Sequence, residues 1–201
     1  MPEPYRAFGT IVQLQIQRSP LKIGERPARR YDPTPLLRVD RLLVTARGAI
    51  GWLPDGSAVL DVHHDDHPAT RGRDGGRGLS IGFTSHYGVM RQRLGERVRD
   101  GVAGENVLVE SDRLHTLVGL GPRLGVTSAT TGETAWLAQL AVARPCKAFS
   151  RYCLGRPETS TEELKDVLQF LEEGTRGFYA SLADPSVPVI LRPGDRVVAA
   201  E

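Results

Sequence analysis

Hydrophobic and polar residues alternate along several short stretches of the chain, as they do in strands with one buried face. The clearest stretch is 10–17, where Val12, Leu14 and Ile16 alternate with three glutamines. Strands outnumber helices without a regular alternation of the two, which predicts a mainly β fold, a closed or partly closed β-barrel with a few peripheral helices. Further strands are expected at 36–44, 49–53, 58–62, 106–110, 113–118, 124–130, 134–143, 177–183, 187–191 and 196–199. The sequence Pro-Asp-Gly-Ser at 54–57 predicts a turn between two of them.

Two stretches have the hydrophobic period of a helix. One is 84–95, which ends at Gly95. The other follows Ser160, which forms a Ser-x-x-Glu capping box with Glu163. Between the first two strands, 19–35 contains four prolines and is interpreted as a long loop. Long loops in compact domains are often functional, so we expect this one to form part of the rim of a site.

The length, charge and cysteine content of the chain limit the classes of protein to which it can belong. The 201 residues are expected to form a single domain over 1–201. They contain no apolar run of the roughly 20 residues that a membrane span requires, so no membrane partner is expected. A net charge of +2 without a basic block gives no reason to expect a nucleic-acid partner. Two cysteines and no secretory signal pattern predict a cytoplasmic protein with reduced thiols.

A cluster of histidines and carboxylates lies at 63–67, with the sequence His-His-Asp-Asp-His. In an extended chain His63, Asp65 and His67 share one face, and their side chains suit zinc, iron or manganese. One interpretation is therefore a metal-dependent hydrolase. The other, which we rank above a dedicated metal site, is a polar loop, because alternate positions in one segment rarely complete a site. His64 belongs to the same cluster.

Cys146 lies just beyond an expected strand end, between Arg144 and Lys147. Nearby positive charge favours the thiolate, which is the form that acts as a nucleophile or metal ligand. Cys153 is expected to be a small buried hydrophobic residue. Neither a Gly-x-Ser-x-Gly nucleophile elbow nor a Walker or dinucleotide motif is present, so the common hydrolase and nucleotide-binding signatures are excluded.

Four segments of the chain form a pattern together: Gly-Glu-Asn-Val-Leu-Val-Glu at 104–110, Arg-Pro-Cys-Lys at 144–147, Gly-Phe-Tyr-Ala at 177–180 and Pro-Gly-Asp-Arg-Val at 193–197. Their order resembles the MOSC domain, named for the C-terminal part of molybdenum cofactor sulfurases. The resemblance implies a strand-rich barrel that binds a molybdenum cofactor (molybdopterin) and a small-molecule substrate. It also implies a cysteine, here Cys146, that ligates molybdenum or carries sulfur. The activity would be reduction of N-hydroxylated compounds or sulfur transfer.

The resemblance also implies a set of cofactor-binding residues and a redox partner. Arginines suit the pterin phosphate because they can bind it bidentately. Pyridoxal phosphate is not expected in this chain. With no set of cysteines for an iron–sulfur cluster, a reductase would need a separate electron-donor protein. A third possibility is a non-catalytic β-module that binds an anion or a partner. The implied cofactor-binding residues are Asn106, Arg144 and Lys147, followed by His63, His64 and Arg176.

Overall fold

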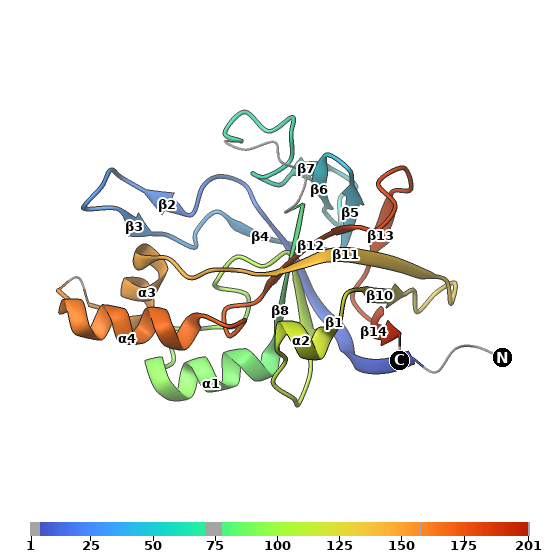
Figure 1. Cartoon of the computed structure of the whole chain (residues 1–201). Helices are drawn as coiled ribbons and strands as arrows, with labels where there is room; N and C mark the ends of the chain where they lie inside the picture. Colours follow the sequence, from blue (N-terminus) through green and yellow to red (C-terminus); the bar gives the residue numbers. More distant parts are fainter. Residues whose placement is uncertain (1–4, 71–77, 157, 201) are drawn as a thin grey trace.

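The structure is a computed structural model, which describes residues 5–70, 78–156 and 158–200. Within these residues the chain forms mostly short strands, and its helices are few (Figure 1). The strands are β1 Tyr5–Gln17, β2 Lys22–Ile23, β3 Arg30–Tyr31, β4 Leu36–Val39, β5 Arg41–Thr45, β6 Gly48–Trp52, β7 Ala58–Leu60, β8 Leu79–Phe83, β9 Val107–Glu110, β10 Leu124–Thr127, β11 Thr134–Val142, β12 Phe178–Leu182, β13 Val189–Leu191 and β14 Arg196–Ala200. The helices are α1 Thr84–Leu94, α2 Leu117–Leu120, α3 Lys147–Leu154 and α4 Thr161–Leu171.

Seven strands close into a barrel, which confirms the predicted fold class. The order around the barrel is β1, β14, β10, β11, β12, β8, β9 and back to β1, and the β1–β14 pairing closes it. Strands β8 and β9 are parallel, and the other pairs in the ring are antiparallel. Apolar side chains from all seven strands fill the interior as one cluster. Closure leaves the ring without an unpaired edge.

Strand β1 is long because it pairs with three neighbours in turn: β14, β9 and β4. A bulge between Ile11 and Gln13 shifts the side-chain alternation by one position. Val12 is consequently 43% exposed, whereas Ile11 and Leu14 are buried. The predicted strand is confirmed, but the predicted inward position of Val12 is wrong. The bulge changes which face each side chain occupies, and the sequence alternation alone does not reveal it.

A second sheet, in the order β13, β5, β6, β7, lies beside the barrel, and β2 and β3 form a separate hairpin. The predicted strand 36–44 is divided at Asp40 into β4, which pairs with β1, and β5, which belongs to the second sheet. The predicted turn at 54–57 does connect β6 to β7. The predicted loop 19–35 contains the β2–β3 hairpin, so it is more ordered than expected.

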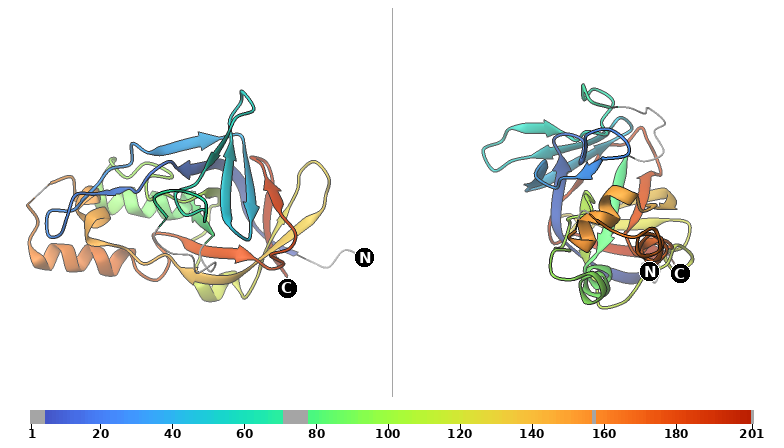
Figure 2. Two further views of the ribbon diagram at one scale, coloured as in Figure 1. Left: turned by 90° about the horizontal axis from the view of Figure 1, so that it is seen from above. Right: turned by 90° about the vertical axis from the view of Figure 1, so that its left-hand side faces the viewer.

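Helices α1, α3 and α4 gather beyond one end of the barrel, on the side where the β2–β3 hairpin extends (Figures 1 and 2). Helix α4 has the predicted capping box at Ser160. Helix α3 was not predicted, and the predicted strand 113–118 is wrong. That segment is a loop that leads into α2, whose first turn is capped by the Thr116 side chain. Among the described residues no helix has the length and apolar character needed to span a membrane.

Two histidines join α1 to the loop that follows β9. His86 Nδ1 donates a hydrogen bond to Gly174 O (3.0 Å), and His86 Nε2 accepts one from His115 N (2.8 Å). His86 is therefore held in its neutral form. Burial lowers the pKa of His86. Burial, together with the positive charges of Arg6 and Arg113, lowers the pKa of His115 to about 4.

These lowered pKa values predict a loss of stability in mild acid. The unfolded chain binds more protons than the folded chain as pH falls from about 6.5 toward 4, so folding weakens over that window. We expect His115 to contribute a loss of about 1 kcal/mol between pH 7 and pH 5, allowing for its partial exposure. Urea denaturation at the two pH values measures it. A His115→Gln variant with the same pH dependence as the parent would contradict the assignment.

Candidate functional site

A pocket of about 560 Å³ opens at one end of the barrel, and we call it the barrel-end pocket. It is bounded by the end of β1 at Gln17, by the start of β8 at Ser80, and by the loop before β9. The β2–β3 hairpin covers it from one side, through Lys22 and Tyr31 among others. The loop 19–35 therefore lines a pocket rim, as expected. A volume of this size is typical of small-molecule sites.

A buried carboxylate, Asp61, organises one wall of the pocket. Its Oδ2 accepts hydrogen bonds from Gln17 N (2.8 Å) and Asn106 Nδ2 (3.0 Å). Its Oδ1 accepts from His63 N (2.9 Å) and His63 Nδ1 (2.8 Å). Burial raises the pKa of Asp61, but the bonds and charge of His63 and the Gln17 bond outweigh it, so the pKa is lowered. Asp61 is thus an anion that joins β1, the segment after β7 and the segment before β9.

Asn106, one of the residues that the resemblance implied, does line the barrel-end pocket. Its side-chain oxygen accepts hydrogen bonds from Ser80 N (3.1 Å) and Ser80 Oγ (2.9 Å). Its amide nitrogen donates to Asp61 and to Gln15 O (3.2 Å). Both ends of the amide are therefore engaged within the protein. Asn106 shapes the wall and orients Asp61.

His63 also lines the pocket, and its side chain is 57% exposed. Because the Asp61 carboxylate can only accept, His63 Nδ1 must carry the hydrogen of their shared bond. The other ring nitrogen, Nε2, is then the one that can exchange a proton. The structure thus places an Asp–His pair at the pocket wall.

Glu105 and Tyr87 form a second buried polar pair beneath the pocket. Tyr87 OH donates to Glu105 Oε2 (2.6 Å) and accepts from Ala103 N (3.0 Å). Burial raises the pKa of Glu105. Its carboxyl group fits because the facing positions are glycines: a Cβ at Gly82 would lie 2.9 Å from Glu105 Oε1. Because Glu105 adjoins Asn106 in sequence and Tyr87 also accepts from Ala103 N, this pair anchors the loop before β9 from inside.

Arg176 connects the pocket to α3. It lines the pocket, its Nη2 donates to Ala103 O (2.9 Å), and its guanidinium lies 5.6 Å from the centre of the Phe149 ring in α3. Burial disfavours its charge, but Tyr179 and Glu105 outweigh that effect and raise its pKa. Its Nε is buried without a hydrogen-bond partner among the described residues. A buried guanidinium donor of this kind is suited to an acceptor in the pocket.

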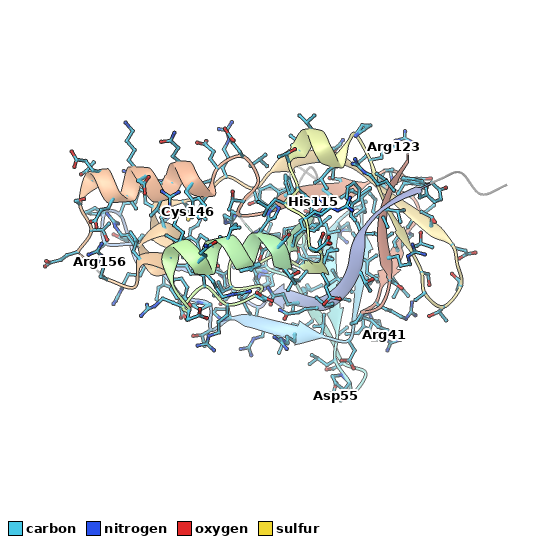
Figure 3. The ribbon with its side chains drawn as sticks, turned by 90° about the horizontal axis from the view of Figure 1, so that it is seen from below. Arg41, Asp55, His115, Arg123, Cys146 and Arg156 are labelled. Carbon is cyan, nitrogen blue, oxygen red and sulfur yellow. The ribbon has the colours of Figure 1, made fainter. Side chains whose placement is uncertain are left out.

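Cys146 immediately precedes α3 and packs, partly exposed, against the second hydrophobic cluster. That cluster includes Tyr31, and α3 packs on the β3 strand that carries Tyr31. Cys146 therefore lies next to the pocket wall without being one of the residues that line it. Cys153 is buried, as expected, and burial raises its pKa to about 12. Of the two thiols, only Cys146 is partly accessible, at the helical end of the molecule (Figure 3).

Three of the implied residues lie elsewhere. Arg144 and Lys147 are exposed on either side of Cys146 and do not line the barrel-end pocket. His64 is buried, with its backbone close to the β5–β6 turn: a Cβ at Gly48 would lie 2.8 Å from His64 Cα. Its Nδ1 accepts from Asp66 N (3.2 Å).

The histidine and carboxylate cluster at 63–67 does not assemble a metal site. His67 Nε2 contacts Arg18 O (3.1 Å), and its Nδ1 accepts from Ala69 N (3.1 Å). His63 pairs with Asp61 rather than with Asp65 or His67. Across the described residues, no group of three or more histidine, cysteine or carboxylate side chains converges as metal ligands do. The polar-loop interpretation therefore describes this segment better than a hydrolase centre.

Some residues of the pocket were not anticipated from the sequence. Glu105, Tyr31, Lys22 and Arg29 line the wall, and the most important unanticipated residue, Asp61, is buried behind it and holds His63. Glu105 adjoins Asn106 in the Gly-Glu-Asn segment, which was a signal that could have identified it. Lys22 and Arg29 lie in the loop expected at a rim, and their charges indicate an anionic ligand.

Comparisons with known proteins give a fold but no named family. No family model and no curated protein sequence matches the chain. The structure of YuaD from Bacillus subtilis aligns over 96% of this chain and 94% of its own, with 14% identity and a TM-score of 0.54. A structure described as a hypothetical protein aligns over 97% of this chain and 70% of its own, with 13% identity and a TM-score of 0.53. At these identities the likeness shows that the chains share a fold, and the fold alone.

Proposed function

We propose that this chain binds a molybdenum cofactor at the barrel-end pocket and reduces N-hydroxylated compounds. The observation that carries the proposal is the buried, unpartnered Nε of Arg176 in the wall of a pocket beside Cys146. An anionic phosphate is the acceptor that such a donor suits best. The MOSC-like motif order around Cys146 and the closed barrel support the same choice.

The residues present fit such a cofactor. Lys22 and Arg29 add two positive charges to the rim, so the pocket favours an anion on two sides. Cys146 supplies a soft sulfur ligand of the kind that molybdenum accepts. It is the residue immediately before the eight-residue helix α3, and its thiol is partly accessible.

Different side chains of the protein would bind different parts of the cofactor. Arg176, Lys22 and Arg29 would hold the phosphate, and Cys146 would hold the metal. When bound, the molybdenum would supply the two-electron removal of an oxygen atom from the substrate. Tyr31, with its hydroxyl fixed on Val102 O at 2.7 Å, gives a rigid surface between the thiol and the pocket. Electrons would come from a separate electron-donor protein.

Replacing the accessible cysteine tests the proposal. The chain would be produced in cells that make the cofactor, and molybdenum and pterin per chain would be measured. We expect Cys146→Ala to retain at least about tenfold less molybdenum than the parent, because no neighbouring side chain replaces a metal ligand. Cys153→Ala is the matched control, since it removes a buried thiol from the same helix, and should load as the parent does.

Two other results separate the remaining interpretations. A parent protein that carries sulfur on Cys146 but no molybdenum would indicate a sulfur carrier. A parent protein with neither would overturn the proposal and leave a non-catalytic β-module. Stoichiometric zinc that is lost on changing His63 or His67 would instead support a hydrolase.

A further inference from the structure

The geometry of the Asp61–His63 pair is suited to proton transfer, and cofactor binding as proposed above gives this pair no role. Asp61 is 1% exposed and accepts four hydrogen bonds, so its carboxylate is fixed in place. It receives the Nδ1 hydrogen of His63 at 2.8 Å, which sets the tautomer of the ring. Nε2 is then free to exchange protons at a side chain that lines the pocket and is 57% exposed.

The other titratable groups of the pocket are less suited to the same role. Lys22 and Arg29 face it from the hairpin, Arg176 and Tyr179 from the β12 side, and Glu105 from the loop before β9. Arg176 stays charged, because the fields of Tyr179 and Glu105 outweigh its burial and raise its pKa. Glu105 is buried and already accepts from Tyr87. Burial raises the pKa of Tyr31 well above its usual value. His63 combines a side chain that is 57% exposed with a ring nitrogen, Nε2, that can both accept and donate a proton.

We propose that His63 takes up a proton from solvent on Nε2 and donates it to the oxygen that leaves an N-hydroxylated substrate, and that Asp61 positions the ring for this step. The N–O bond breaks, and two electrons from the separate electron-donor protein reach the substrate. One proton comes from His63 and joins the leaving oxygen, and a second proton is taken up by the nitrogen from the buffered solvent, so the products are the reduced nitrogen compound and water. Solvent then reprotonates His63. This role rests on the proposed function, and Asp61 acts through His63 as a positioning residue.

The test uses the molybdenum-loaded protein with benzamidoxime as substrate and reduced methyl viologen as electron donor. The kcat is expressed per bound molybdenum, so that loading and catalysis are measured separately. We expect His63→Gln to lower kcat at least about 100-fold with little change in KM, as loss of a general acid does. Added imidazole should restore much of the activity of a His63→Gly variant, an effect that a structural role would not produce.

His67→Gln is the matched control. His67 lies four residues along the same loop, both of its ring nitrogens are bound to the backbone, and it does not line the pocket. Its replacement should leave kcat per molybdenum within about twofold of the parent value, since it removes no proton donor. A fall equal to that of His63→Gln would mean that the loop, and not the imidazole, determines the rate, and would overturn the role.

A measurement on the metal-free protein adds a readout that does not depend on activity. Nitrogen-15 NMR of labelled histidine should show His63 with its hydrogen on Nδ1, and Asp61→Asn should shift that tautomer. A neutral ring in the parent with its hydrogen on Nε2 and none on Nδ1 would overturn the proposal. Loaded His63→Gln that turns over at the parent rate would overturn the role of His63 alone, and loss of molybdenum from it would show that His63 holds the cofactor instead. A parent without molybdenum overturns the proposed function itself.

Discussion

Gly9→Ala is expected to lower the free energy of unfolding by about 4 kcal/mol and the melting temperature by about 10 °C. Gly9 has φ of 154° at an irregularity of β1, where the strand passes from β14 to β9. A Cβ at this position would lie 1.8 Å from Glu110 O, a backbone atom of the neighbouring strand. Because β9 cannot move without disturbing its own pairing with β8, the collision must separate strands of the closed barrel. Thermal denaturation followed by circular dichroism measures the effect.

Gly132→Ala provides the control for backbone conformation. Gly132 lies in the β10–β11 turn with φ of 75°, and nothing lies within 4 Å of its added Cβ. We expect Gly132→Ala to lower the free energy of unfolding only by the cost of a positive φ in a residue with a Cβ, about 1 kcal/mol. The difference between the two variants measures the close approach of β1 to β9. Equal losses would show that the strands can separate at Gly9 without a further penalty, contrary to the register seen in the barrel.

Most of the strands could be predicted from the sequence, because the alternation of hydrophobic and polar residues and the residues typical of turns are features of a few neighbouring positions. The 10–17 strand, the 54–57 turn and the capping box at Ser160 were of this kind, and all three are confirmed. The bulge at Ile11 depends on pairing with β9, about a hundred residues later, and so has no local signal. The 113–118 segment has strand-like residues, but the Thr116 cap favours the short helix α2. Here a side-chain hydrogen bond outweighs residue propensity.

Only part of the candidate site could be predicted from the sequence, because tertiary contacts bring some of its residues together. Resemblance indicated His63, Asn106 and Arg176, and the structure brings these three to one pocket with Cys146 beside it. Asp61 could not be found in this way. In sequence it is one more polar residue at the end of a short strand, and its amide partner Asn106 is 45 residues away. Its importance comes from a tertiary contact between the end of β1 and two later segments.

Asp61→Ala is expected to lower the free energy of unfolding by about 3–5 kcal/mol. The change leaves Gln17 N, His63 N and Asn106 Nδ2 without their acceptor at a buried position. The pKa of Asp61 is lowered in the folded state, so its stabilisation is complete above the unfolded pKa of about 4 and is lost only as pH falls below it. The loss in the variant should therefore be the same at pH 5.5 and pH 8 in urea denaturation.

Asp184→Ala is the matched control for this change. Asp184 also accepts two hydrogen bonds, from Ser186 N (2.9 Å) and Ser186 Oγ (2.6 Å), but it lies in an exposed turn. Water can replace the carboxylate there, so a much smaller loss of stability is expected than for Asp61→Ala. If the two variants were equally stable, the buried network around Asp61 would not hold the pocket wall together. The fixed orientation of His63 would then have to come from the backbone of its loop alone.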